Sequence, residues 1–150
     1  QLAIRRGISN VPDEKKIKNL ARLAKNILEP VRAHFGKPFT PSSGYRSAAL
    51  NAALGGAAAS QHIQGEAVDF EIPGIANREV AEWIRGHLEF DQLILEFHDS
   101  ADPASGWVHV SLKAKANRGQ CLTINRHGRF AGLLSGARKR LKRFPVAGIP

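Results

Sequence analysis

Cysteine is nearly absent from this 150-residue chain, which contains only Cys121. A lone cysteine excludes an internal disulfide and any zinc knuckle built from several cysteines. Long apolar runs are also missing, because no stretch approaches the roughly eighteen residues that a membrane span requires. The opening segment, QLAIRRGISNVP, lacks the apolar core of a secretory signal, so we recognise no signal peptide in this sequence. The length and the 43% apolar share are those of one globular domain.

Acidic residues are missing from the carboxy-terminal quarter. All thirteen Asp and Glu residues lie at or before Asp102, whereas ten Lys and Arg residues lie within 113–150. The preceding 112 residues carry twelve basic and thirteen acidic side chains, so the formal net charge of +9 belongs to the end of the chain. A near-neutral body with a basic end predicts a folded unit with an anion-seeking appendage. We therefore divide the chain into a domain, 1–135, and a basic tail, 136–150.

The hydrophobic periodicity predicts helices first and short strands afterwards. Apolar residues recur every three or four positions between Ile17 and Val31, which predicts an amphipathic helix that begins near Pro12–Asp13. We expect Pro30 to kink or divide this helix and Gly36 to close it. This order favours a single compact α+β domain whose helices pack on a small antiparallel sheet. The other expected elements are a helix over 47–54, a helix capped by Asn77, strands over 67–72, 92–97 and 107–112, and a hairpin of 121–125 with 130–134.

Polar residues stand at two apolar positions of the expected strands. Asp69 and His109 each lie between two apolar neighbours, where an unpaired polar group is costly to bury. His62 lies on the polar loop before Asp69. Two histidines and one carboxylate are a nitrogen and oxygen ligand set that zinc favours, and three protein ligands leave a fourth position for water. This spacing alone does not favour a metal site, since a histidine in a strand is more often a satisfied core residue.

Three motifs in a fixed order carry a more specific signal. They are Ser-Gly-Tyr-Arg-Ser at 43–47, Ser-x-His-x-x-Gly-x-Ala-x-Asp at 60–69 and Gly-Trp-Val-His-Val at 106–110. Together they resemble the zinc D-Ala-D-Ala carboxypeptidase family, which also includes vancomycin-resistance dipeptidases and phage L-alanyl-D-glutamate endopeptidases. The resemblance covers roughly residues 5 to 125 and is strongest to single-chain phage or prophage members. It implies a Zn²⁺-dependent peptidase that cuts D-amino-acid-containing bonds of bacterial peptidoglycan, as a carboxypeptidase or an endopeptidase, with a phage endolysin as one form.

The resemblance also implies roles for individual residues. His62, Asp69 and His109 match the zinc ligands of the family. Arg46 matches an arginine that binds and polarises the substrate, and its planar guanidinium suits a carboxylate or a carbonyl oxygen.

Two neighbours of the metal motifs are candidates for contact with the substrate. Ser60 matches a serine of the family motif, and its hydroxyl either bonds the substrate or holds a turn. Trp107 stands two residues before His109, where we expect it to form a wall of the cleft.

The catalytic glutamate departs from the pattern of many family members. They carry it three residues before the last histidine ligand, where this chain has Gly106. A carboxylate must still lie beside the reacting water. We assign this role to Glu96, which closes a predicted strand; the related Hedgehog signalling domain also has a glutamate at the end of the strand before its last zinc histidine. Asp99 and Asp102 on the following loop are alternative bases, and His98 is a candidate donor to the transition state.

Two other classes of function compete with the peptidase. The missing glutamate at position 106 keeps open a non-catalytic zinc-binding interaction domain, as in the Hedgehog relatives, and the basic tail keeps open a nucleic-acid or scaffold-binding protein such as a phage virion component. The peptidase hypothesis implies a monomer that acts on peptidoglycan stem peptides at the bacterial cell wall or in the periplasm. Residues 113–150 would then bind anionic wall or outer-membrane surfaces rather than contribute to catalysis.

Overall fold

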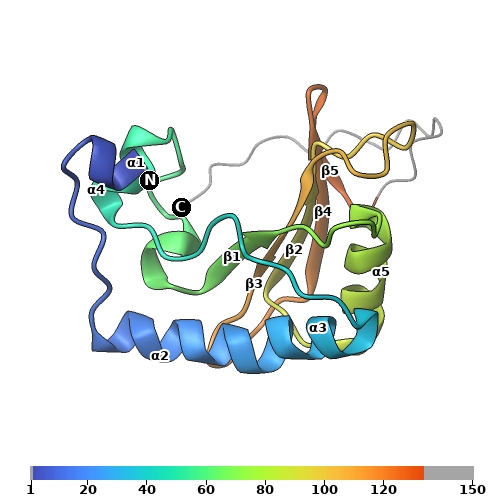
Figure 1. Cartoon of the computed structure of the whole chain (residues 1–150), viewed down its shortest axis with the longest axis horizontal. Coiled ribbons are helices and arrows are strands. Elements are labelled where there is room, and N and C mark those ends of the chain that lie inside the picture. The colour runs from blue at the N-terminus through green and yellow to red at the C-terminus, as the bar shows by residue number, and fades with distance from the viewer. Residues whose placement is uncertain (1, 134–150) are drawn as a thin grey trace.

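A single five-stranded sheet organises the computed structural model, which describes residues 2–133 (Figure 1). The strand order is β1-β3-β2-β4-β5, and every neighbouring pair is antiparallel except β2 with β4. The predicted α+β class is confirmed, but the sheet is mixed rather than wholly antiparallel. The reason is that β3 runs back along β2 and the next loop reverses the chain again, so β4 runs in the direction of β2. The strands are β1 (Ala67–Phe70), β2 (Gln92–Glu96), β3 (Trp107–Ser111), β4 (Gln120–Asn125) and β5 (Gly128–Ala131).

The longest helical segment runs below the sheet in Figure 1 and joins three pieces end to end. Asp13 caps it by accepting a hydrogen bond from the backbone N–H of Lys16, and Gly36 ends it in the left-handed conformation. One wide turn precedes Pro30, where the N–H of Glu29 donates to the carbonyl of Ala24 five residues earlier. The expected division of the helix near its proline is therefore a π-turn rather than a break. The pieces are α2 (Glu14–Leu23), the π-helix η1 (Ala24–Leu28) and α3 (Glu29–Phe35).

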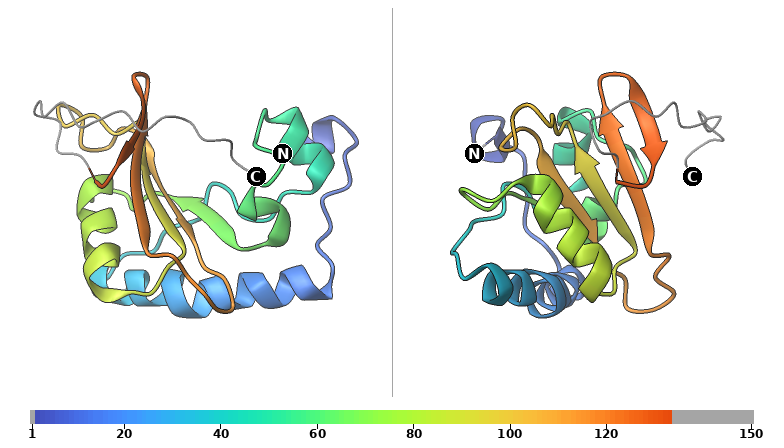
Figure 2. Two further views of the ribbon diagram at one scale, coloured as in Figure 1. Left: turned by 180° about the vertical axis from the view of Figure 1, so that it is seen from behind. Right: turned by 90° about the vertical axis from the view of Figure 1, so that its right-hand side faces the viewer.

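Alternation along the strands separates a core face from an open face. The odd-numbered residues of β2 and the even-numbered residues of β1 and β3 form the core. Helix α5 (Asn77–His87) lies against this face in both views of Figure 2, and the α2–α3 segment closes the core from below. The opposite face is left to the cleft described below. The core residues include Leu23, Ile27, Val31, Val68, Phe70, Val80, Ile84, Leu93, Leu95, Val108 and Val110.

Asn77 does not cap α5 as predicted. Ala76 occupies the cap position without a side-chain hydrogen bond, and Asn77 is the first helical residue. The Asn77 amide instead donates to the backbone carbonyls of Ser105 (3.1 Å) and Gly106 (3.0 Å). It thereby fastens the β2–β3 loop at the point where β3 begins.

The remaining helices are short, and one of them replaces the polar loop predicted around His62. The 3₁₀ helix η2 (Gln61–Gln64) carries His62, and α1 (Leu2–Arg5) and α4 (Ala48–Ala53) lie near it at the upper left of Figure 1. No helix within residues 2–133 combines the length and apolar character needed to cross a membrane. The predicted boundary at 135/136 and the basic tail lie outside the described residues.

Candidate metal centre and its cleft

The open face of the sheet carries the predicted site in two adjacent rows. Residues paired across neighbouring strands point to the same side. One row runs from Asp69 on β1 through His109 on β3 and Ile94 on β2 to Leu122 on β4. The next row contains Trp107, Glu96, Ile124 and Arg129 on β3, β2, β4 and β5. Residues separated by as many as forty positions in the sequence therefore become neighbours through strand register alone.

His62, Asp69 and His109 converge on one point from three different segments. Their ligand atoms all lie within 4.8 Å of one another, and all three residues are buried. His62 Nε2 lies 3.3 Å from one Asp69 oxygen, and His109 Nδ1 lies 2.7 Å from the other. Ligands at zinc–ligand distances near 2.1 Å in a tetrahedron are about 3.4 Å apart, so this spacing fits a zinc ion after small side-chain adjustments.

Hydrogen bonding outside the group prepares His62 for a metal. His62 Nδ1 lies 2.7 Å from the carbonyl oxygen of Gly44. Because a carbonyl only accepts, Nδ1 must carry a proton, and Nε2, which faces Asp69, is the ring nitrogen left to bind a metal. An outer hydrogen bond of this kind fixes the tautomer and ring orientation of metal-binding histidines. The donor set and its support therefore fit zinc.

The Asp69 carboxylate is ionised although it is buried. Burial raises its pKa, but hydrogen bonds from His109 and His62 and their charges outweigh this effect and hold the pKa well below its usual range. Arg46 adds a further donor at 2.8 Å. An anionic carboxylate is the form that binds a metal ion.

Arg46 and Ser60 both lie in the cleft, and both also support the metal group. The Arg46 guanidinium spans Ser43 Oγ (2.8 Å) and Asp69 Oδ2 (2.8 Å), so part of its hydrogen-bonding capacity is already used. Ser60 caps η2, and its hydroxyl accepts the backbone N–H of His62 at 3.3 Å. Ser60 therefore holds a turn, which is one of its two expected roles. It also lines the cleft, so its contact with the substrate stays a prediction.

Glu96 lies beside the metal group, at the end of β2. It pairs with Trp107, two residues before His109 on the adjacent strand, and lines the same cleft. Burial raises the pKa of its carboxyl above the ordinary value; the charges of His109, His62 and Arg46 oppose this shift and that of Asp69 adds to it. A partly buried carboxyl of raised pKa is suited to accepting and releasing a proton near neutral pH.

Gly106 has no room for the glutamate that many relatives carry at this position. Its φ is +71°, and a Cβ built on it would lie 1.9 Å from the carbonyl oxygen of Glu96. The backbone of the β2–β3 loop thus crosses directly over the end of β2. Any side chain at position 106 would therefore clash with the backbone at the end of β2.

The cleft around these residues has a volume of about 610 Å³. Trp107 lines it as predicted, and its ring centre lies 5.4 Å from that of the half-exposed Phe97. Glycines and alanines of the segment 55–59 line the cleft as well, so the chain passes close to the site there. The full lining is Arg46, Gly55, Gly56, Ala57, Ala59, Ser60, Gln61, His62, Asp69, Gln92, Ile94, Glu96, Trp107, His109, Arg118, Ile124 and Arg129.

The alternative proton carriers lie outside this lining. Asp99 accepts the N–H of Ala101 and Asp102 accepts that of Ala104, so both carboxylates close turns of the exposed β2–β3 loop. His98 is likewise not among the cleft residues. Asp102 borders a larger groove of about 850 Å³, which contains none of the metal group and neither Arg46 nor Glu96.

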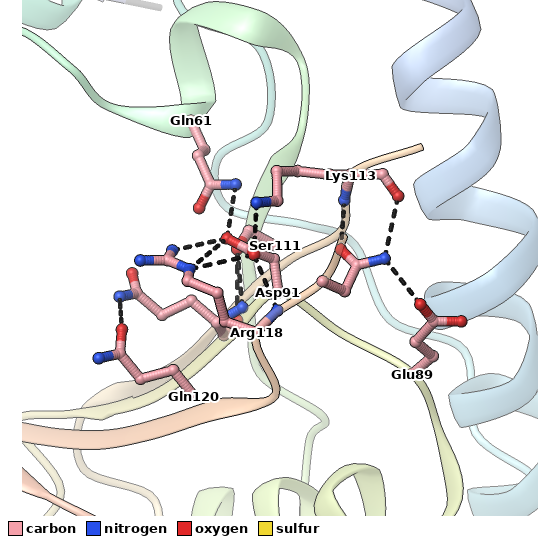
Figure 3. A network of polar contacts seen from close by, with 9 residues as sticks. Gln61, Glu89, Asp91, Ser111, Lys113, Arg118 and Gln120 are labelled. Atoms are coloured by element: carbon pink, nitrogen blue, oxygen red, sulfur yellow. Dashed lines mark hydrogen bonds and ion pairs between the residues drawn. The ribbon is translucent and has the colours of Figure 1, made fainter. Parts of the chain in front are cut away.

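An ion network around the buried Asp91 braces the turn that carries His62 (Figure 3). Asp91 is 0% exposed and accepts from Arg118 through Nε (3.1 Å) and a terminal nitrogen (2.6 Å), and from Lys113 at 2.9 Å. Gln61, the residue before His62, donates to the same carboxylate at 3.1 Å. The start of β2, the β3–β4 loop and η2 are therefore tied together at one end of the cleft.

Two cleft residues, Arg118 and Arg129, were missed by the sequence analysis. Both were counted in the basic stretch 113–150, to which we assigned surface binding. Residues 113–133, which fall within the predicted domain 1–135, contain β4 and β5, and these strands extend the sheet because β4 pairs with β2 and β5 pairs with β4. The predicted hairpin of 121–125 with 130–134 indicated that this segment belongs to the sheet. Only the observed strand register, however, places Arg129 in the same row as Glu96.

Comparison with known proteins adds one match. A family model described as Peptidase M15 matches residues 1–111, which include all three predicted metal ligands, Arg46 and Glu96. No curated protein matches the chain. The matched region ends at the last residue of β3, so β4 and β5 lie beyond it.

Proposed function

Because this chain belongs to the peptidase M15 family, whose members are zinc-dependent peptidases that act on peptidoglycan, we propose that it hydrolyses a D-amino-acid-containing bond of the wall peptide with Glu96 as the proton carrier. The observation that supports this role is the position of Glu96, which is anchored on a strand beside the metal group and lines its cleft. That position also favours an enzyme over a non-catalytic zinc-binding domain.

His62, Asp69 and His109 would hold the metal. Zinc at this position would supply a Lewis acid for the peptide carbonyl and would lower the pKa of the attacking water.

Glu96 and Arg46 contribute through their own atoms. Glu96, in its ionised form, accepts the proton that the attacking water loses as its oxygen joins the carbonyl carbon. It then delivers this proton to the leaving nitrogen as the C–N bond breaks, so the products are a carboxylic acid and an amine. Arg46 donates toward the negative charge that develops on the carbonyl oxygen, while its bond to Asp69 keeps the guanidinium in place.

The test compares Glu96→Gln with Asp99→Asn on purified peptidoglycan in the presence of zinc. We expect Glu96→Gln to retain zinc and fold but to lose hydrolysis by a factor on the order of 10² or more. Asp99→Asn should stay near the wild-type rate, because Asp99 serves a turn outside the cleft. A Glu96→Gln protein with wild-type turnover, together with an inactive Asp99→Asn or Asp102→Asn protein, would move the catalytic carboxylate to the loop.

The setting of the reaction follows from its substrate. We propose that the protein acts at the bacterial cell wall and that the basic tail, 136–150, increases its concentration on anionic wall or outer-membrane surfaces. An endolysin of phage origin is consistent with this arrangement.

A further inference from the structure

Three arginines line the cleft, and their bonding differs. Arg46 is bonded to Asp69, and Arg118 is bonded to the buried Asp91. The exposed side chain of Arg129 has no hydrogen bond or ion pair with any residue of the range 2–133. It also follows the region that the family model matches, so the match assigns it no role.

Strand register places Arg129 across the cleft from the metal group. Arg129 pairs with Ile124, and Ile124 pairs with Glu96. Neighbouring strands lie about 4.8 Å apart, so the Cα atoms of Glu96 and Arg129 are separated by about 10 Å. The floor between them is apolar, because Ile94 and Ile124 line the cleft there.

The order of groups across the sheet defines a direction for the substrate. The metal group lies on β1 and β3, Glu96 on β2 and Arg129 on β5. A scissile carbonyl at the metal group places the leaving nitrogen toward Glu96, which must protonate it. The part of the substrate that follows the leaving nitrogen then lies over Ile124 and points to Arg129.

We propose that Arg129 binds the free α-carboxylate of the leaving residue, so that the enzyme removes a single terminal amino acid. This inference rests on the proposed function and deepens it by naming the substrate as a peptide with a free carboxy terminus. An extended residue spans about 3.5 Å, so the roughly 10 Å between the Cα atoms of Glu96 and Arg129, less the reach of the two side chains, leaves room for one residue rather than several. The apolar floor suits a small apolar side chain on that residue.

The chemistry of the guanidinium supports a carboxylate as its partner. A planar guanidinium forms two parallel hydrogen bonds to a carboxylate, whereas a terminal carboxamide offers one acceptor oxygen and no charge. An unpaired arginine beside Ile124 therefore favours a peptide that ends in a free acid over the same peptide ending in an amide.

The experiment uses two substrates that differ only in this group. They are acetylated L-Lys-D-Ala-D-Ala and its carboxy-terminal amide, incubated with the zinc-loaded full chain, and the released D-Ala or D-alaninamide is quantified. We expect the wild type to prefer the acid by on the order of tenfold in kcat/KM, as for a charged hydrogen bond. Arg129→Gln should lose this preference through a higher KM for the acid, with little change for the amide.

Two further variants separate charge from general damage. Arg129→Lys should keep part of the preference, because the charge remains while the two-pronged geometry is lost. Arg126→Gln is the matched control: Arg126 is an exposed arginine of the same hairpin that lies outside the cleft, where it donates to His127. It should cut both peptides as the wild type does.

Four outcomes would overturn the inference or its basis. Equal cleavage of acid and amide by the wild type, or equal losses on both in Arg129→Gln, removes the carboxylate subsite. Release of amino groups from intact peptidoglycan without cleavage of either tripeptide also rejects the subsite but keeps the proposed function. No hydrolysis of tripeptides or peptidoglycan by the zinc-loaded wild type rejects the proposed function itself.

Discussion

Gly106, at the start of β3, should tolerate substitution poorly, and Gly106→Ala tests the reason. Its φ of +71° is strained for any residue with a Cβ, at a cost of about 1 to 2 kcal/mol. The added Cβ would also lie 1.9 Å from the carbonyl oxygen of Glu96 and 2.6 Å from the carbonyl carbon of Phe97. Both contacts are with backbone atoms, so they cannot be relieved by rotating a side chain.

The size of the effect follows from these two terms. Forcing a methyl group into a packed site costs about 1 to 3 kcal/mol beyond the strain, so the free energy of unfolding should fall by about 2 to 5 kcal/mol. For a domain of this length that corresponds to a Tm lower by about 6 to 15 °C. Because the strained segment joins Glu96 to Trp107, hydrolysis should fall together with stability.

Gly119→Ala is the matched control for the strain alone. Gly119 has a similar φ of +59°, but a Cβ there would meet nothing within 4 Å. This variant should lose only about 1 to 2 kcal/mol. Denaturant unfolding of the two variants measures both costs. If Gly106→Ala costs no more than Gly119→Ala, the crossing of loop and strand does not restrict position 106.

Three further predictions concern the metal, acid stability and the tail. His109→Ala should abolish stoichiometric zinc binding, and unchanged zinc content and affinity by metal analysis would contradict the assigned ligand set. Asp91→Asn should cost about 1 to 3 kcal/mol at pH 7, since it removes the negative charge of a buried carboxylate that accepts charged hydrogen bonds from the partly exposed Arg118 and Lys113. Burial raises the pKa of Asp91, but hydrogen bonds from Arg118 and Lys113 outweigh it and hold the folded-state pKa below the unfolded value. The stability that ionised Asp91 contributes is therefore complete above about pH 4 and is lost as the pH falls further. Unfolding curves of the Asp91→Asn variant and the wild type should converge at low pH. Removing residues 135–150 should weaken binding to whole sacculi while turnover of a soluble peptide stays nearly unchanged, and equal loss of both would place the tail in the folded unit.

The metal group was within reach of sequence reasoning because its signal is local. Asp69 and His109 stand at apolar positions of strands whose alternation is visible in the sequence, and the motifs identify His62. The order of helices and strands and the helix end at Gly36 follow from local patterns in the same way. Each of these features depends on a few neighbouring residues.

Features that depend on register and long-range packing could not be predicted in this way. The parallel pairing of β4 with β2 is set by which edge of the sheet the chain returns to after residue 119. This pairing turned two residues of an apparently uniform basic stretch, Arg118 and Arg129, into cleft residues. Asn77 looked like a helix cap because asparagine often serves as one, but its amide satisfies the carbonyls of the β2–β3 loop instead.

The glycine at position 106 and the glutamate at position 96 are linked by packing. Since a side chain at 106 would overlap the end of β2, a carboxylate near the metal group must come from a neighbouring element. Glu96 on β2 meets this need, and it lies on the side of the metal group that faces β4 and β5. A carboxylate on that side would protonate a leaving group directed toward the hairpin, where Arg129 has no other partner within residues 2–133. The position of the acid and the unpaired arginine therefore favour the same orientation of the substrate, although they lie on strands that do not pair with each other.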